Sequence, residues 1–151
     1  MKITVCAIGR LKAGPERDLW ERYYIRLRCP LKIIELEERK KVPAVELKRL
    51  EGTLLTGAIP TGALVVALDE RGKSFSSNDF ANQISSWNNM GRNLTFLIGG
   101  SNGIDQSTLD NAHLTMSFGK ATWPHMLARI LLIEQLYRAE QILAGTPYHR
   151  V

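Results

Sequence analysis

The sequence has few cysteines and no long apolar run, and each shortage removes a class of protein. Its two cysteines, Cys6 and Cys29, are too few for a disulfide framework, and neither stands at a metal-ligand spacing. No apolar run approaches the roughly 20 residues of a membrane span. The first eight residues read as a strand that turns at Gly9, without the cleavage site of a secretory signal. We therefore expect a cytoplasmic protein with reduced, mostly buried thiols, no metal centre and no membrane partner.

Repeats and low-complexity linkers are also missing from the 151 residues. The chain is long enough for one domain with a substantial hydrophobic core. Its content of 44% hydrophobic and 23% charged residues is ordinary for a globular protein, so composition does not favour disorder. We therefore expect residues 1–151 to form one domain.

The charge is unbalanced, with a formal net charge of +5 and fifteen of the twenty Lys and Arg residues before position 74. A compact cluster comprises Arg39, Lys40 and Lys41, and Arg22 and Arg26 recur along a predicted helix. Such residues attract the phosphates of nucleic acids whatever the base sequence. Acidic residues are interleaved with them, so charge alone leaves both a polyanion-binding surface and a solvated face open.

Strand and helix patterns alternate along the chain. Continuous apolar strands that alternate with helices indicate an α/β fold, in which a mostly parallel sheet is covered by helices on both faces. Ligands of such sheets bind beyond the carboxyl ends of the strands. The predicted strands cover residues 3–8, 32–36, 63–68, 94–98 and 114–118, and the predicted helices residues 16–27, 43–55, 76–87 and 124–143.

Residues 96–105, FLIGGSNGID, place three glycines directly after an apolar strand. A dinucleotide fingerprint needs G-x-G-x-x-G and a later acidic residue, and a P-loop needs a Lys after its last Gly, so the G-G-x-x-G spacing matches neither. Glycines without a Cβ allow backbone to approach a flat ligand such as an adenosine group. A turn without any ligand is the alternative, and this loop alone does not decide between them.

Three stretches together carry a family resemblance: residues 3–9, the FLIGGSNGID loop, and the segment from Trp123 to Ala139, which reads WPHMLARILLIEQLYRA, with its TPYHRV end at 146–151. Over essentially its whole length the chain resembles the RlmH (YbeA-like) ribosomal RNA methyltransferases of the SPOUT superfamily. The resemblance implies an α/β domain with a deep C-terminal trefoil knot, acting as a homodimer. It also implies methylation of N3 of pseudouridine 1915 in 23S ribosomal RNA by S-adenosylmethionine, with the assembled ribosome as substrate.

The same resemblance implies that three loops hold S-adenosylmethionine, mainly through backbone. Leu68 ends the first strand concerned, and Gly99 and Gly100 form the second contact. Two positions depart from the family pattern: Trp123 replaces a smaller aliphatic residue, and Met126 stands where Pro is expected. The third loop comprises Phe118, Gly119, Lys120, Ala121, Thr122 and Trp123.

The polar residues near the end of the chain are the candidates for catalysis. Uracil N3 carries a proton that has to leave, and histidine titrates near neutral pH, so His149 is a candidate to take that proton or to orient a water that does. Arg150 is placed to hold the developing oxyanion or a phosphate, and Tyr148 to stack on the base. The alternative is that this tail only anchors RNA. In a knotted dimer we expect it to serve the neighbouring subunit's pocket.

Two further polar features have structural interpretations. His125 follows Pro124 at a predicted helix start that Thr122 is placed to cap, which favours a structural role for this histidine. Glu134 and Arg138 are spaced as a helix-stabilising pair. Among enzymes, the alternative is a related knotted methyltransferase that acts on transfer RNA or on a ribose 2′-hydroxyl. The alternative from a different class is a non-catalytic ribosome-binding protein that kept the knot.

Overall fold

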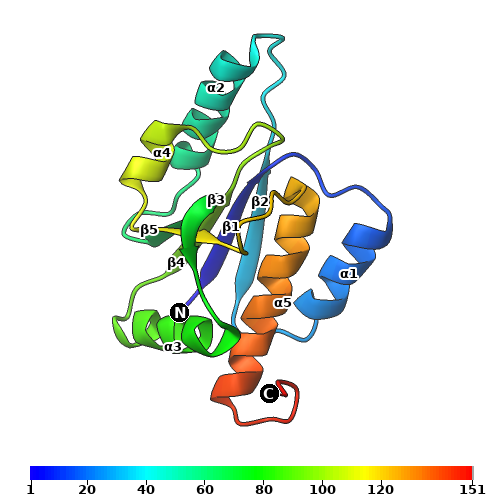
Figure 1. The fold of residues 1–151 in the computed structure, drawn as a ribbon, viewed down its shortest axis with the longest axis vertical. Coiled ribbons are helices and arrows are strands. Elements are labelled where there is room, and N and C mark those ends of the chain that lie inside the picture. The colour runs from blue at the N-terminus through cyan, green and yellow to red at the C-terminus, as the bar shows by residue number, and fades with distance from the viewer. Residues whose placement is uncertain (151) are drawn as a thin grey trace.

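A sheet of five parallel strands forms the centre of the molecule in the computed structural model, which describes residues 1–150 (Figure 1). The strand order is β2-β1-β4-β3-β5, so the predicted mostly parallel α/β sheet is confirmed. The strands are β1 (Ile3–Ile8), β2 (Leu31–Leu36), β3 (Leu64–Ser74), β4 (Leu94–Ile98) and β5 (Leu114–Ser117). The helices are α1 (Pro15–Tyr24), α2 (Ala44–Gly57), α3 (Ser77–Asn89), α4 (Gln106–Asn111) and α5 (His125–Leu143).

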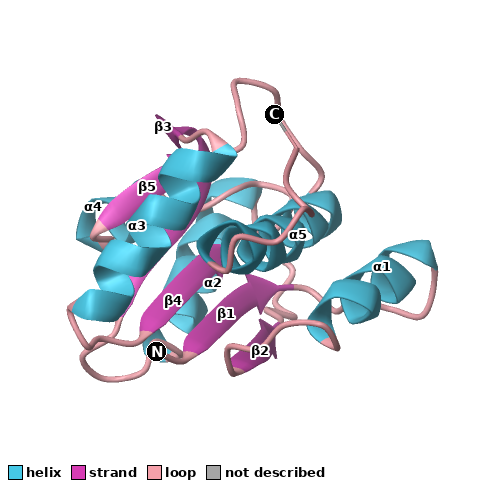
Figure 2. Cartoon of the chain, turned by 90° about the horizontal axis from the view of Figure 1, so that it is seen from below, coloured by secondary structure: helices cyan, strands magenta, loops and turns pink. Residues whose placement is uncertain are grey.

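Helices cover both faces of the sheet, as Figure 2 shows: α1, α3 and α5 lie on one face, and α2 and α4 on the other. Successive side chains of a strand point to opposite faces, so each central strand feeds two cores. On β4, for example, Phe96 packs with Leu132 of α5, whereas Leu97 packs with Leu55 of α2. This double burial explains why the central strands are apolar at nearly every position.

Both cysteines are free, as expected, with Cys6 buried and Cys29 half-buried. Burial raises the pKa of the Cys6 thiol to about 11 and that of the Cys29 thiol to about 12. Thiolate is the reactive form of cysteine, so both side chains are unreactive near neutral pH.

Several predicted element ends are wrong, each because of a distant contact. Helix α1 stops at Tyr24 instead of residue 27, since the backbone amides of Arg28 and Cys29 donate to the Glu140 carboxylate and hold that segment outside the helix. Strand β3 continues past residue 68 to Ser74, because β5 pairs with it again at Lys73 and Ser74.

The start of α5 also differs from the prediction. Pro124 is its N-cap residue, and no side chain caps the helix. The hydroxyl of Thr122, predicted to be the cap, instead donates to the carboxylate of Glu70 on β3. That hydrogen bond ties the loop before α5 to the sheet.

A fully buried guanidinium fixes this end of α5. Arg129 donates from Nη2 to the carbonyl oxygens of Ile8 (3.0 Å) and Gly9 (2.6 Å), and from Nη1 to a Glu35 carboxylate oxygen at 2.6 Å. That oxygen also accepts from the backbone amide of Leu11 at 2.6 Å. The first turns of α5 are therefore bound to the carboxyl ends of β1 and β2.

These contacts make stability depend on pH. Burial alone would raise the pKa of Glu35, but the hydrogen bonds from Arg129 and Leu11 and the charges of Arg129 and Arg10 hold it below its ordinary value. A carboxyl whose pKa is lower in the folded than in the unfolded state stabilises the fold above the unfolded value, about 4.3. That contribution is lost as the pH falls through the folded value.

We predict that Glu35→Gln lowers the free energy of unfolding at pH 7 by about 1–3 kcal/mol, because Arg129 and Leu11 lose a charged acceptor. The difference from wild type should begin to shrink below about pH 4 and should disappear as the pH falls through the lowered pKa of folded Glu35, where this carboxyl becomes neutral. Urea unfolding of both proteins at pH 7 and below about pH 4 measures this difference in the free energy of unfolding. Glu21→Gln, which removes an exposed partner of Arg17, is the control and should change stability little. A Glu35→Gln deficit that is the same at both pH values would contradict the account.

Helix α2 lies close to the loop that follows β4 because of Gly52. A Cβ at this position would lie on the carboxylate of Asp105, the N-cap residue of α4, and 2.7 Å from Thr108 Oγ1. Asp105 in turn accepts hydrogen bonds from the amide and hydroxyl of Thr108. The position of α2 against this loop therefore requires glycine.

We predict that Gly52→Ala destabilises the protein by about 1–3 kcal/mol, since the packed cap has to move. Gly57, at the end of the same helix, is a matched control, because a Cβ added there would have no neighbour within 4 Å. Gly57→Ala should be neutral or stabilising by up to about 1 kcal/mol. Thermal unfolding of both variants is the measurement, and equal melting temperatures would contradict the packing argument.

Candidate functional site

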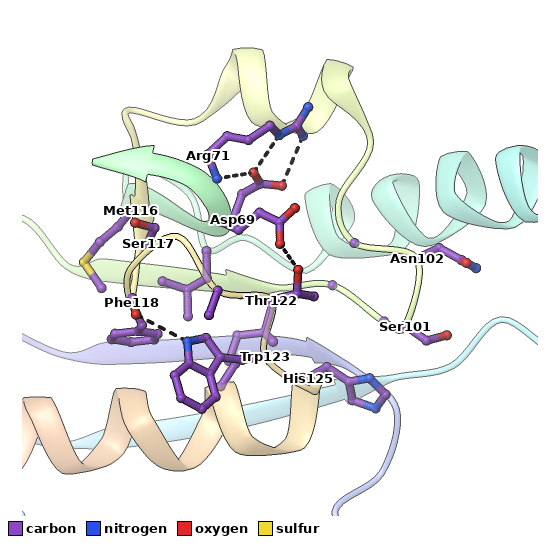
Figure 3. Close-up of a pocket in the computed structure, with 18 of the residues that line it drawn as sticks. Asp69, Arg71, Ser101, Asn102, Met116, Ser117, Phe118, Thr122, Trp123 and His125 are labelled. Atoms are coloured by element: carbon purple, nitrogen blue, oxygen red, sulfur yellow. Dashed lines mark hydrogen bonds and ion pairs between the residues drawn. The ribbon is translucent and has the colours of Figure 1, made fainter. Parts of the chain in front are cut away.

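A pocket of about 440 Å³ lies at the carboxyl edge of the sheet, and we call it the edge pocket. A bulge within β3 and the loops that follow β4 and β5 form most of its wall, and the first turn of α5 closes one side (Figure 3). Its position matches the ligand site expected for a parallel α/β sheet.

The first wall comes from a bulge in β3. Leu68 and Lys73 both pair with Met116 of β5, so the four residues between them are displaced from the ladder. Arg71 donates to the Asp69 carboxylate from its amide (2.9 Å), Nε (2.8 Å) and Nη2 (3.1 Å). These bonds hold the pKa of Asp69 below its ordinary value, so an ionised carboxylate lines the edge pocket (Figure 3).

The second wall is the glycine loop after β4, which folds back on itself. Gly100 and Gly103 form an antiparallel bridge, with the amide of Gly103 donating to the carbonyl of Gly100 at 3.0 Å. Gly103 has a φ of +80°, in the left-handed region that favours glycine. A Cβ at Gly99 would lie 2.6 Å from the Gly103 carbonyl oxygen. This tight turn exposes backbone to the edge pocket.

Gly100 meets a different neighbour. A Cβ there would lie 2.6 Å from a carboxylate oxygen of Glu51 and 3.1 Å from Ile8 Cγ2. Glu51 belongs to α2 and is buried, and this burial, followed by the charge of Glu38, raises the pKa of its carboxyl. A side chain at Gly100 would therefore disturb the contact with α2 before it reached a ligand.

The third wall is the loop after β5. The Trp123 indole N–H donates to the Phe118 carbonyl at 3.3 Å, which closes the loop, and Thr122 joins it to Glu70 (Figure 3). The side chain of Trp123 is 45% exposed. It lines the pocket next to His125, whose pKa is lowered by burial and by the charge of Arg129.

Nearly all of the residues expected to bind a cofactor line the edge pocket. Lys120 is the exception, since it is exposed on the third loop and lies outside the pocket lining. The residues that line it are Leu68, Gly99, Gly100, Phe118, Gly119, Ala121, Thr122 and Trp123.

The tail, residues 146–150, lies at the other end of the molecule (Figure 1). The tail turns back along α5 as far as Arg138 and Glu134, thirteen and nine residues after His125, so roughly 14–20 Å of helix separates it from the edge pocket. Here the Tyr148 hydroxyl donates to Glu134 at 3.1 Å, and the Tyr148 ring packs edge-on against Tyr137, with centroids 4.8 Å apart. The structure thus separates the candidate catalytic residues Tyr148, His149 and Arg150 from the candidate cofactor residues of the same chain.

Several lining residues have no signal in the sequence. Lys48 reaches the edge pocket from α2, and only the packing of that helix on Asp105 brings it there. Met116 and Ser117 end β5 immediately before the third loop, and extending the predicted site back by two residues would have included them.

Among residues 1–150, no three His, Cys, Asp or Glu side chains are grouped so that they could hold a metal ion. Among the same residues, no helix has the length and apolar character needed to cross a membrane.

Comparison with known proteins identifies the family. The model described as predicted SPOUT methyltransferase matches residues 1–149. A Rhodospirillum centenum protein named ribosomal RNA large subunit methyltransferase H is 49% identical over 151 residues, covering 99% of each chain. Proteins of the same name from Dinoroseobacter shibae (49% identical, 100% of both chains) and Paramagnetospirillum magneticum (46%, 99% of both) are equally full-length matches. The resemblance read from the motifs is confirmed: the chain belongs to the SPOUT methyltransferases and is itself a methyltransferase.

Proposed function

We propose that this enzyme transfers a methyl group from S-adenosylmethionine to N3 of pseudouridine 1915 in 23S ribosomal RNA, on the assembled ribosome of the cytoplasm. Full-length relatives named ribosomal RNA large subunit methyltransferase H support the substrate class. The observation that carries the proposal is the edge pocket, where two loops present backbone and the bulge of β3 presents two carboxylates.

The edge pocket fits this methyl donor in size and in chemistry. Its volume of about 440 Å³ lies within the range of pockets that bury small ligands. Gly99 and Gly100 bring loop backbone into the pocket wall, where its N–H and C=O groups suit the edge of an adenine ring. The donor carries positive charge on its sulfur and its amine, and Asp69 and Glu70 provide carboxylates in the pocket wall.

When bound, S-adenosylmethionine supplies an electrophilic methyl group on a positively charged sulfur. The chain's own residues then have to orient that group towards the base and to stabilise charge on the base. The bonds from Arg71 to Asp69 and from Thr122 to Glu70 fix two carboxylates before any ligand arrives.

The distance between tail and pocket supports a homodimer. Contacts with Glu134 and Arg138, nine and thirteen residues after His125 on α5, hold the tail roughly 14–20 Å along the helix from its own edge pocket, which favours its acting at the pocket of another subunit. We therefore propose that the tail of one subunit serves the edge pocket of its partner, in a dimer that also has the deep trefoil knot implied by the family resemblance.

The basic residues fit the same arrangement. Lys40 and Lys41 follow the carboxyl end of β2, at the same edge of the sheet as the pocket. Arg26, just after α1, lies over the Tyr137 ring at 4.6 Å, next to the tail, and Arg22 is exposed on the last turn of α1. If the tail reaches a partner's pocket, Lys40 and Lys41 of one subunit and Arg22 and Arg26 of the other lie around the same site. Both pairs would then face the same bound RNA. This arrangement supports RNA contact over a merely solvated face.

Labelled methyl transfer to ribosomes tests the function. Purified enzyme should place label on one base of 23S RNA in ribosomes from cells that lack the gene. A non-catalytic binding protein labels nothing, and an enzyme for transfer RNA or a ribose hydroxyl labels a different molecule or atom.

We predict that Ala121→Trp lowers the affinity for S-adenosylhomocysteine at least about tenfold, because Ala121 is an exposed residue whose enlarged side chain fills the edge pocket. Lys120→Trp, one residue away on the same loop but outside the pocket, is the matched control and should bind normally. Calorimetric titration of both folded variants is the measurement. Equal affinities of the two variants for S-adenosylhomocysteine would show that the cofactor does not bind in the edge pocket.

Subunit mixing tests the shared site. A chain ending at Pro147 should bind cofactor and dimerise but lose turnover, and Ala121→Trp should lose turnover through its blocked pocket. We predict that mixing the two inactive proteins under exchange conditions restores methylation, because mixed dimers combine an open pocket with an intact partner tail. If the tail serves its own chain's pocket, the mixture stays inactive, and a fully active truncation would show that the tail has no role.

A further inference from the structure

The tail is bound to α5 by a chain of three side chains. Glu134 accepts from Arg138 Nε at 2.9 Å and from Nη2 at 2.5 Å, both on the same carboxylate oxygen. The remaining terminal nitrogen of Arg138, Nη1, lies 3.1 Å from Nδ1 of His149. We call Glu134, Arg138 and His149 the tail relay.

The direction of the last hydrogen bond follows from chemistry. A guanidinium has only N–H donors and no acceptor, so Nδ1 of His149 has to accept. An accepting nitrogen carries no proton, and a neutral imidazole has one, which therefore lies on Nε2. Among residues 1–150, Nε2 of His149 has no hydrogen-bond partner, so this N–H is available to a ligand.

The guanidinium is held in this orientation from two sides. Glu134 fixes one edge and also accepts from the Tyr148 hydroxyl at 3.1 Å. The Tyr148 ring lies 4.8 Å from the guanidinium carbon, on the face of the group. With the ion pair largely shielded from solvent, Arg138 keeps Nη1 directed at the imidazole.

We propose that Glu134 and Arg138 are positioning residues that fix His149 as its Nε2–H tautomer, so that the tail gives the pyrimidine a hydrogen-bond donor instead of a base. This inference rests on the proposed function and assigns the role of His149 within it. The donor contacts the pyrimidine oxygen that gains negative charge.

The reaction balances without a protein base. The N3 proton leaves to solvent water, and the resulting negative charge spreads over the two carbonyl oxygens next to N3. The lone pair on N3 forms the new N–C bond as the carbon–sulfur bond of the donor breaks, and that bond's electron pair stays on sulfur. A donor aimed at a carbonyl oxygen stabilises the charge both before and during the transfer.

The phenol of Tyr148, next to His149, is not the base either. Burial, hydrogen bonding to Tyr23 and Glu134, and the Glu134 charge all raise the pKa of Tyr148, so it remains protonated and serves as a donor to Glu134. Tyr148 and His149 therefore both act as hydrogen-bond donors.

Two amide substitutions separate a donor from a base. Glutamine places an N–H near the position of imidazole Nε2, and asparagine places its amide near Nδ1, while neither can take up a proton near neutral pH. We expect His149→Gln to keep the single-turnover methylation rate within about tenfold of wild type. His149→Asn and His149→Ala should each lose about a hundredfold. If His149 is a base, the glutamine variant is as slow as the other two.

The positioning role has a spectroscopic readout. In 15N-labelled protein, two-bond proton–nitrogen spectra identify which ring nitrogen carries the proton, and the chain has only three histidines to assign. Wild type should show His149 protonated at Nε2 alone, and Arg138→Leu should show both tautomers. Arg49→Leu, which removes the exposed pair with Glu46 on α2, is the matched control and should leave spectrum and rate unchanged.

The two kinds of failure are distinguishable. A wild-type His149 protonated at Nδ1, or a glutamine variant that folds and dimerises yet is as slow as alanine, overturns the inference. A wild-type enzyme that binds S-adenosylhomocysteine but labels no ribosomal RNA overturns the proposed function, and the tautomer measurement is independent of that result.

Discussion

The arrangement of the site depends on the hydrogen bonds that the Arg129 guanidinium makes with the ends of two strands. The guanidinium is fully buried, yet its partners lie on two strands, β1 and β2, far away in the sequence. A buried charge is costly unless it is paired, and removing a partner from such a group typically costs about 3–5 kcal/mol. The first turns of α5 are therefore held at one height above the carboxyl edge of the sheet. His125, one turn earlier, is placed against the edge pocket by the same contact.

From that fixed end, α5 determines where the rest of the chemistry lies. The first turn of the helix closes the edge pocket, and its middle and second half carry Glu134 and Arg138, to which His149 of the tail is bound. The helix keeps the tail relay apart from the edge pocket of the same chain, and this separation is the reason for proposing a site shared between two chains. In the proposed dimer, each subunit contributes its pocket to one site and its tail to the other.

The sequence predicts the sheet well because the central strands are buried on both faces and are apolar throughout. It also locates the loops around Gly99 and after Phe118, since the ends of such strands are marked by glycines. It misses the bulge after Leu68, because that bulge depends on how β5 pairs with β3. Gly99 and Gly100 are predicted only in part. Their sequence indicates that another group approaches the backbone closely, but it does not show that the neighbour of Gly100 is Glu51, which depends on the position of α2.

Pairs far apart in the chain are the features that sequence patterns do not predict. Arg129 and Glu35 are 94 positions apart, and nothing local marks either as a partner. Arg138 does have a local interpretation, the helix pair with Glu134, and that interpretation is correct. This interpretation does not include Nη1 of Arg138. Its contact with His149 depends on how the chain turns back after α5.

The most direct measurement is mass spectrometry of 23S ribosomal RNA from cells with and without this gene. The account predicts one methylated pseudouridine, at position 1915, that disappears with the gene and returns with the wild-type copy. A copy carrying Ala121→Trp should not restore it, because its edge pocket is blocked. Ribosomal RNA that is identical with and without the gene, or full restoration by the blocked copy, would contradict the account.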